Sequence, residues 1–196
     1  MTPLILIRHA PTAWNARGLI QGRTDVPLGA AGRQRAAAWR PPAEAVDCDW
    51  LSSPLARARA TAEVMAGRTV PVDDRLAEMS WGAWEGRRLA DLRAELGHGM
   101  SGLEALGLDF RPPGGESPRD VQSRLRPLLA ELAARRRTTL AVTHKGVIRA
   151  VYAAATGWDM TGKPPHRLRS EAAQVFLLDA AGAPRIARLN QGLAAP

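Results

Sequence analysis

The sequence predicts an α/β fold with a mainly parallel central sheet. Short apolar runs alternate along the chain with longer segments of helical pattern, which is typical of strands joined by helices. The chain has 196 residues, the length of one domain. Its 45% hydrophobic residues are an ordinary fraction for a globular protein. We therefore expect a single domain over residues 1–196.

Five apolar segments have the length and composition of buried strands. The first, Leu4–Ile7, runs directly into Arg8 and His9. The later ones are Asp49–Leu51, Leu140–Thr143, Ala173–Leu178 and Arg185–Leu189, with Val70–Val72 as a weaker candidate.

Two helices are expected in the first third of the chain. Residues 29–40 have a helical pattern that ends before a Pro-Pro pair, where a helix is disfavoured. Residues 52–67 carry the residue types that begin and end helices. Here Ser53 is expected as the N-cap, Pro54 as the first helical residue and Gly67 as the end.

Two further helices are expected in the second half. Residues 117–136 begin with the N-cap Ser117 and then Pro118. Inside this segment Pro127 predicts a kink or a restart of the helix. Residues 146–157 are apolar on nearly every face, so this helix should be well buried.

Composition narrows the range of partners and compartments. The net charge of +8 permits anionic partners. The basic run at 135–137 ends a predicted helix, where it complements the helix dipole, so we expect no nucleic-acid partner. The single Cys48 allows no internal disulfide and fits a reducing compartment. Neither a membrane-spanning stretch of about 20 residues nor a signal peptide is found, so we expect a cytoplasmic protein without a membrane partner.

Cationic and imidazole side chains follow the ends of three expected strands. Arg8 and His9 follow the first, Arg57 lies in the first turn of the helix after the second, and His144 follows a later one. Ligands of such sheets bind beyond the carboxyl ends of the strands, so we expect the four residues to meet. Like charges about 4 Å apart repel by ~4 kcal/mol at an effective dielectric near 20, so the cluster calls for a multiply charged anion. Arginine binds phosphate oxygens in a bidentate manner, and cationic neighbours keep an imidazole neutral and nucleophilic.

A metal site is the alternative interpretation of two histidines and a carboxylate. However, His9 and His144 are 135 positions apart, no HExxH spacing occurs, and the arginines would oppose a divalent cation. We therefore expect no metal and no other cofactor. The other two histidines, His98 and His166, lie in loop-like regions and are expected to be exposed.

The segment LIRHAPTAWN resembles the RHG motif of the histidine phosphatase superfamily, the phosphoglycerate mutase-like proteins. The resemblance covers most of the chain, and its motifs follow one another in the family's order. They are QGRTDVPLGAAGRQRA (21–36), SSPLARARATA (52–62), LAEMSWGAWEG (76–86), PPGGES (112–117) and VTHKGVIRA (142–150). The resemblance implies a three-layer α/β/α fold with a mixed, mostly parallel central sheet. We expect the Gly- and Pro-punctuated segment at about 87–116 to form a lid.

The resemblance also implies five catalytic residues. His9 matches the phosphorylated nucleophile, and Glu78 matches the proton donor to the leaving group. Arg8, Arg57 and His144 match the residues that hold the transferring phosphoryl group. Such roles fit the chemistry, because phosphoryl transfer is catalysed mainly by charge and position around three equatorial oxygens.

Four more residues are implied to bind substrate. Asn15 matches a phosphate-contacting asparagine, and Gln21 and Gly22 match a segment that contacts the phosphate or the leaving group. Thr12 matches the threonine of the extended motif and is expected to support the pocket.

Two positions depart from the family pattern. Ala10 replaces the glycine of RHG, which matters only if that backbone needs a positive φ. Lys145 replaces the glycine that often follows the second histidine, and it either contacts substrate or points to solvent. Trp81 and Trp84 flank Glu78 and are expected to be packing residues, with the lining of an apolar leaving-group pocket as the alternative.

The resemblance favours hydrolysis over mutase activity. Mutases tend to have Arg-His-Tyr after the catalytic glutamate and a longer insertion, whereas this chain has Met79-Ser80-Trp81 and a modest segment. We therefore expect a histidine acid-type phosphatase that hydrolyses a small phosphorylated metabolite through a phosphohistidine. Phosphoglycerate mutase is the alternative, and a non-catalytic phosphate-binding protein on the same fold is a further one. The substrate, α-ribazole phosphate or another phosphomonoester, and a homodimeric state are left open by the sequence.

Overall fold

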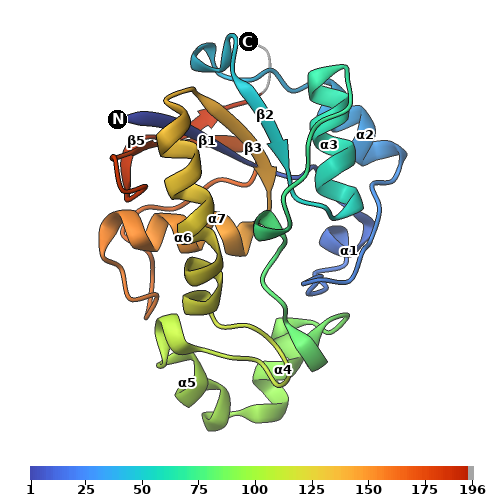
Figure 1. Cartoon of the computed structure of the whole chain (residues 1–196). Helices are drawn as coiled ribbons and strands as arrows, with labels where there is room; N and C mark the ends of the chain where they lie inside the picture. The colour runs from blue at the N-terminus through green and yellow to red at the C-terminus, as the bar shows by residue number, and fades with distance from the viewer. Residues whose placement is uncertain (194–196) are drawn as a thin grey trace.

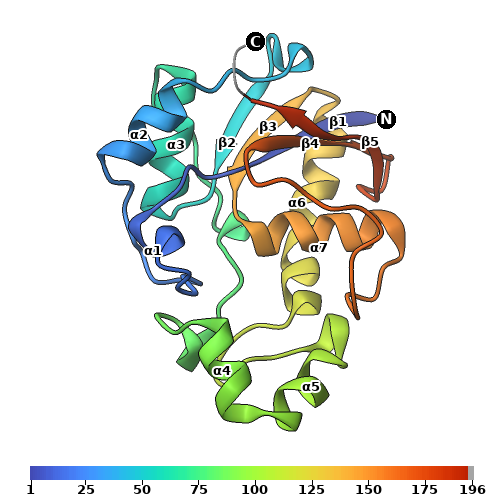
Figure 2. The ribbon, with the colours of Figure 1, turned by 180° about the vertical axis from the view of Figure 1, so that it is seen from behind.

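A five-stranded mixed sheet forms the centre of the molecule, with helices on both faces (Figures 1 and 2). The computed structural model describes residues 1–193. The strand order is β2-β3-β1-β4-β5. The strands are β1 (Thr2–Arg8), β2 (Asp49–Ser52), β3 (Thr139–Thr143), β4 (Ala172–Leu178) and β5 (Pro184–Gly192). The predicted three-layer α/β/α fold with a mixed sheet is confirmed.

The parallel and antiparallel parts of the sheet are separate. β1 and β2 both pair with β3 in parallel, so the carboxyl ends of these three strands lie at one edge. β4 pairs with β1 and with β5 in antiparallel fashion, which completes the other side of the sheet. Arg8 ends β1, and His9 and His144 directly follow β1 and β3 at that edge. The weaker strand candidate Val70–Val72 is reduced to an isolated bridge between Val72 and Ser52.

The two faces of β1 show why the sheet needs two helical layers. Leu4 and Leu6 lie in one buried cluster with residues of α6 (Pro118–Arg135) and α7 (Lys145–Thr156). Ile5 and Ile7 lie in a second cluster with residues of α2 (Ala30–Ala37) and α3 (Ala56–Ala66). Successive side chains of a strand point to opposite faces, so a wholly apolar strand is buried on both sides. Each pair of helices is seen on its own side of the sheet in Figures 1 and 2.

The expected lid segment lies beyond the carboxyl edge of the sheet, at the bottom of Figure 1. It contains α4 (Leu89–Leu96), α5 (His98–Glu104) and the short helix η4 (Gly107–Asp109). Its own small apolar cluster is centred on Trp84, Leu92 and Met100. The remaining short elements are α1 (Ala13–Ala16), η1 (Ala43–Ala45), η2 (Asp74–Leu76) and η3 (Gly82–Trp84).

One helix start needs correction, and for a second helix one of two alternatives, a restart at Pro127, is excluded. α3 begins at Ala56, with Leu55 as its N-cap, and not after Ser53. The Ser53 hydroxyl is occupied instead by contacts with the Leu55 amide and with His144. α6 has the predicted Ser117 cap but runs without a restart through Pro127. The carbonyl that loses its donor there belongs to the exposed Ser123, so water can satisfy it.

None of the helices in the described part of the chain has the length and apolarity needed to cross a membrane. The buried helix that was predicted over residues 146–157 is confirmed as α7 and ends at Gly157, which has a left-handed conformation.

Candidate active site

The nucleophile candidate His9 lies directly after β1 and is 4% exposed. Its Nδ1 is 2.8 Å from the carbonyl oxygen of Ala10. A carbonyl can only accept a hydrogen bond, so Nδ1 carries the proton and Nε2 keeps its lone pair. Burial, together with the positive charges of Arg8 and Arg57, lowers the pKa of His9 to about 3. The ring is therefore neutral over the whole physiological range, with Nε2 able to attack.

His144 lies beside His9, with 5.2 Å between the ring centroids. It is fully buried as the N-cap residue of α7. Its Nε2 is 2.7 Å from the Ser53 hydroxyl oxygen. Burial, followed by the charges of His9, Arg57 and Arg8, holds the pKa of His144 well below its usual range. Ser53 positions this ring, a role hidden in the sequence because serine is also the commonest kind of N-cap.

Arg57 is fully buried on the first turn of α3. Its two terminal nitrogens donate to the carbonyls of Gly22, at 2.7 Å, and Thr24, at 2.9 Å. The predicted substrate residue Gly22 therefore holds Arg57 through its backbone. Gly22 has a φ of +52°, and a Cβ there would collide with the Glu85 side chain. Both features require glycine at this position.

Glu85 fastens the loop that carries these carbonyls, and sequence reasoning missed it. Its carboxylate accepts hydrogen bonds from the Arg23 and Thr24 amides at 2.8 Å and from the Trp81 amide at 3.0 Å. The Thr24 hydroxyl donates to it as well, at 2.6 Å. Glu85 thus ties residues 21–25 to the segment that carries Glu78. Its partners Arg23 and Thr24 lie 62 and 61 positions away in sequence, so no local pattern could have indicated them.

Among the described residues, Arg8, Arg57 and His144 each have a side-chain nitrogen left free beside His9. The Arg8 guanidinium donates to the Ser170 hydroxyl at 2.9 Å, which anchors it from the loop before β4. In residues 1–193, four buried side-chain nitrogen or oxygen atoms have no hydrogen-bond partner. Three of them are Arg8 Nε, Arg57 Nε and His144 Nδ1. A buried unpaired polar group costs roughly 1–3 kcal/mol, so their gathering at one place indicates a site for an oxyanion.

The predicted residues Thr12, Asn15 and Gln21 form one hydrogen-bonded group. Thr12 caps α1, and its hydroxyl contacts Asn15 Oδ1 at 3.1 Å and Gln21 Oε1 at 3.0 Å. The oxygens of both amides are thus used, and their NH2 groups donate to no group in residues 1–193. These NH2 groups can serve a ligand. Ala10 has no positive φ, so its replacement of glycine costs no backbone strain.

Glu78 is 9% exposed and faces the N-terminus of α7. One carboxylate oxygen accepts from the Met79 amide at 2.9 Å and the other from the Gly146 amide at 3.2 Å. A Cβ at Gly146 would collide with the Glu78 carboxylate, so this position needs glycine for close approach. The proposed acid is therefore brought to the same helix that begins after His144.

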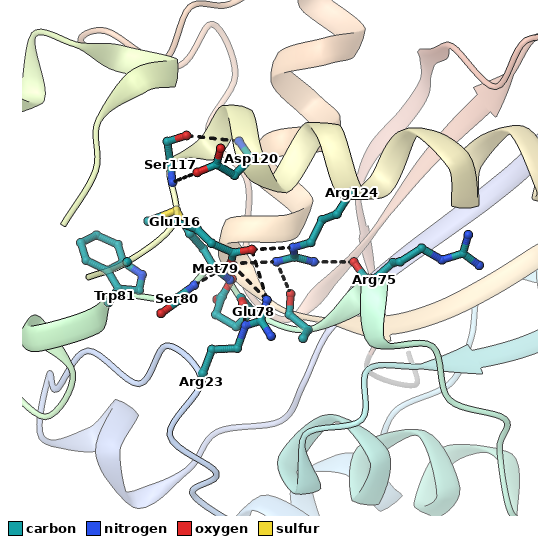
Figure 3. Close-up of polar contacts among 12 residues, drawn as sticks. Arg23, Arg75, Glu78, Met79, Ser80, Trp81, Glu116, Ser117, Asp120 and Arg124 are labelled. Carbon is teal, nitrogen blue, oxygen red and sulfur yellow. Dashed lines mark hydrogen bonds and ion pairs between the residues drawn. The ribbon is translucent and has the colours of Figure 1, made fainter. Parts of the chain in front are cut away.

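A network of charged side chains supports the Glu78 segment from behind (Figure 3). Arg23 donates to the Glu78 carbonyl at 2.9 Å. Arg124 donates to the carbonyls of Arg75 and Ala77. Glu116 bridges the two arginines, with oxygen–nitrogen distances of 3.2 Å to Arg23 and 3.0 Å to Arg124. The same carboxylate accepts from the Ser80 amide at 2.9 Å, so the backbone around Glu78 is fixed on both sides.

A cavity of about 590 Å³ opens beside Glu78, between the sheet domain and the expected lid. Trp81 lines it and also packs against two apolar clusters, so its contact with a leaving group stays a prediction, whereas Trp84 is buried in the lid cluster as a packing residue. Lys145 also lines the cavity. The further lining residues are Met79, Leu89, Arg93, Glu104, Gly107, Phe110, Pro118, Gly146, Arg149, Met160 and Gly162.

The two remaining histidines lie outside the site. His98 and His166 are exposed, as predicted, and His166 Nδ1 is 2.9 Å from the Tyr152 hydroxyl. The described residues contain no group of three or more His, Cys, Asp or Glu side chains that could hold a metal ion. The expectations of no metal and no cofactor stay predictions.

Comparison with known proteins identifies the family. Residues 4–192 match the family model of the histidine phosphatase superfamily (branch 1). The probable phosphoglycerate mutase GpmB of Salmonella choleraesuis is 36% identical over 134 residues, which are 66% of this chain and 62% of that protein. The match thus spans less than two thirds of the length of this curated relative.

Solved structures match over nearly the whole chain. A mycobacterial glucosyl-3-phosphoglycerate phosphatase has a TM-score of 0.79 and 30% identity, with 100% of both chains covered. The phosphoserine phosphatase of Entamoeba histolytica has a TM-score of 0.81 and 28% identity, with 97% of both chains covered. Bacillus stearothermophilus YhfR has a TM-score of 0.81 and 30% identity, over 99% of this chain and 98% of that one. The protein is a member of the histidine phosphatase superfamily.

Proposed function

We propose that the protein hydrolyses small phosphomonoesters through a phosphohistidine formed on His9. The observation that carries the proposal is the neutral His9 ring, with its Nε2 lone pair, beside the unpartnered buried nitrogens of Arg8, Arg57 and His144. We call these three donor residues the anion cradle. Phosphoryl transfer requires a nucleophile and such a group of donors side by side.

The reaction proceeds in two balanced steps. His9 Nε2 attacks phosphorus, the bond from phosphorus to the leaving oxygen breaks, and that oxygen takes a proton from Glu78. Water then attacks the phosphohistidine, gives a proton to Glu78, and inorganic phosphate leaves as the phosphorus–nitrogen bond breaks. Arg8, Arg57 and His144 offer donors to the phosphoryl oxygens in both steps. Because the His9 ring stays neutral in acid, we propose that activity extends to acidic pH, as in an acid-type phosphatase.

Hydrolysis is favoured over mutase activity by two observations. Met79, Ser80 and Trp81 follow Glu78 in place of Arg-His-Tyr, so Met79, which lines the cavity, stands at the position of the mutase arginine. Two of the similar structures are named as phosphatases, of glucosyl-3-phosphoglycerate and of phosphoserine. The relative named as a probable phosphoglycerate mutase keeps mutase activity as the second candidate.

The test is a quenched reaction with ³²P-labelled substrate. Wild type should release inorganic phosphate from p-nitrophenyl phosphate and carry acid-labile, base-stable label, and His9→Ala should lose both. His98→Ala, a change at an exposed histidine outside the site, is the matched control and should keep both. Formation of 2-phosphoglycerate from 3-phosphoglycerate without release of phosphate would establish the mutase instead. Binding of phosphate without turnover would establish a non-catalytic protein.

We also propose a cytoplasmic location, which is supported by Cys48, a buried free thiol that suits a reducing compartment.

A further inference from the structure

Two cations on α7 face the cavity beside Glu78 without a counter-ion. Lys145 and Arg149 are four positions apart, so they lie on one face of the helix, and both line the cavity. In the described part of the chain neither has a carboxylate oxygen within 4.0 Å. The third cation of the wall, Arg93, is paired with Glu104 at 2.6 Å. Within residues 1–193 the α7 side of the cavity therefore carries two unpaired positive charges against the single carboxylate of Glu78, which acts on Lys145 from beyond ion-pair distance.

The surroundings hold Arg149 in place and lower the pKa of both cations. The Arg149 guanidinium carbon lies 4.9 Å from the ring centroid of the buried Trp158, a cation–π contact. Burial lowers the pKa of Arg149. Partial loss of water, followed by the charges of Arg149 and Arg8, lowers the pKa of Lys145. A cation that is partly desolvated without a partner is costly, and an anion bound beside it offsets that cost.

The first turn of α7 lies between the anion cradle, which consists of Arg8, Arg57 and His144 beside His9, and the cavity. Lys145 follows His144 directly, and the next residue, Gly146, donates to Glu78 at 3.2 Å. A leaving oxygen that meets Glu78 thus starts at the base of the cavity. The cavity that would then receive the rest of the leaving group is lined by both Lys145 and Arg149.

We propose that Lys145 and Arg149 form a subsite for a second anionic group, carried by the leaving group of the substrate. This inference rests on the proposed phosphatase function. The proposed substrates are phosphomonoesters whose alcohol bears a carboxylate or a second phosphate. The cavity volume of about 590 Å³ suits a small organic leaving group. The apolar side chains of Met79, Trp81 and Phe110 pack against its carbon skeleton.

Matched substrate pairs test the subsite. 3-Phosphoglycerate and glycerol 3-phosphate differ only in a carboxylate or a hydroxymethyl group. 1,3-Propanediol bisphosphate and 3-hydroxypropyl phosphate differ only in the second phosphate. For each pair, the ratio of kcat/KM values is measured in wild type, Lys145→Met, Arg149→Met and the control Arg126→Met. Arg126 is an exposed arginine of α6 that lines a separate cavity of about 270 Å³, so its loss removes the same charge elsewhere.

Wild type should prefer the doubly anionic member of at least one pair by about tenfold or more, since charge-assisted hydrogen bonds are strong. The pair that shows the preference identifies the second anion as carboxylate or phosphate. The ratio should fall toward one in Lys145→Met and in Arg149→Met and stay high in Arg126→Met. Lys145→Met, an exposed position, keeps the test valid if Arg149→Met does not fold.

A ratio near one in wild type for both pairs, or an equal fall in Arg126→Met, would overturn the subsite. Failure of the phosphatase function is recognised separately, because wild type would then release no phosphate even from p-nitrophenyl phosphate. In that case the same pairs are compared as ligands by thermal shift. A larger shift with the doubly anionic member that Lys145→Met removes still supports the subsite, and equal shifts refute it.

Discussion

Replacement of Glu78 by Gln separates the proposed proton donor from a merely structural carboxylate. The change keeps the shape of the side chain and removes its proton. A nitrophenolate leaves readily as an anion, whereas the alkoxide of glycerol 3-phosphate needs protonation. General acid catalysis contributes about 10²–10⁴-fold, or roughly 3–5 kcal/mol. We expect a loss of that size for glycerol 3-phosphate and a much smaller one for p-nitrophenyl phosphate.

The structure adds a second effect of this substitution, which the assay must remove. Both Glu78 oxygens accept backbone hydrogen bonds, from Met79 at 2.9 Å and from Gly146 at 3.2 Å. The NH2 group of Gln must face one of these N–H donors, and an unpaired donor costs roughly 1–3 kcal/mol. This cost is common to both substrates. The ratio of their rates therefore isolates the role of the proton.

The assay is single-turnover formation of the phosphoenzyme, because Glu78 is also proposed to activate water in the second step. Glu95→Gln, at an exposed carboxylate of α4, is the matched control and should leave the ratio unchanged. If glycerol 3-phosphate and p-nitrophenyl phosphate slow equally, Glu78 only positions its neighbours. His144 is then the next candidate for the acid.

Three more predictions concern metal, pH and support of the acid. Activity should survive EDTA, since guanidinium and imidazole groups neutralise the phosphate; loss that zinc restores would revive a metal site at His9, His144 and Glu78. The pKa of His9 falls from 6.5 to about 3 on folding, so the unfolded chain binds the extra proton and stability falls as pH drops through that window. The free energy of unfolding, measured with urea, should fall between pH 7 and pH 4 by up to about 3 kcal/mol more in wild type than in His9→Gln. Equal falls in the two proteins would refute the lowered pKa of His9. Glu116→Gln should lower kcat for glycerol 3-phosphate roughly three- to tenfold with little change in KM, because the Ser80 amide and Arg124 lose a charged acceptor. An unchanged kcat would show that Glu116 does not support the Glu78 segment.

The anion cradle was predictable because each of its members follows a local pattern. Arg8, His9 and His144 come directly after apolar runs, and Arg57 follows a third run by one turn of helix. Parallel strands place their carboxyl ends at one edge, so four residues from three separate places in the sequence come to one site. Local pattern also predicted the N-cap Ser117, and the structure adds that Ser117 forms a capping box with Asp120, three residues away.

The support of the site was not predictable, because its contacts are not local. Glu85 accepts a hydrogen bond from the Arg23 amide, which is 62 positions away in sequence. Glu116 accepts one from the Ser80 amide, which is 36 positions away. A half-buried carboxylate that accepts amide hydrogen bonds has the same sequence pattern as a solvated one. Ser53 shows the same limit in a single residue, since the pattern that predicts an N-cap is identical to the one that places a hydroxyl against His144.

The role of Lys145, which departs from the family pattern, can be inferred only from the residues around it. By itself it is an exposed lysine at the start of a helix, equally suited to solvent or substrate. The helical period adds Arg149 to the same face, Trp158 fixes that arginine, and the cavity places both beside Glu78. The proposed nucleophile and the anion cradle therefore come from strand ends and α3, whereas the proposed subsite for the leaving group comes from one face of α7. Since the two sets share no side chain, substitutions on that face should change which phosphomonoester is preferred and leave the attack by His9 intact.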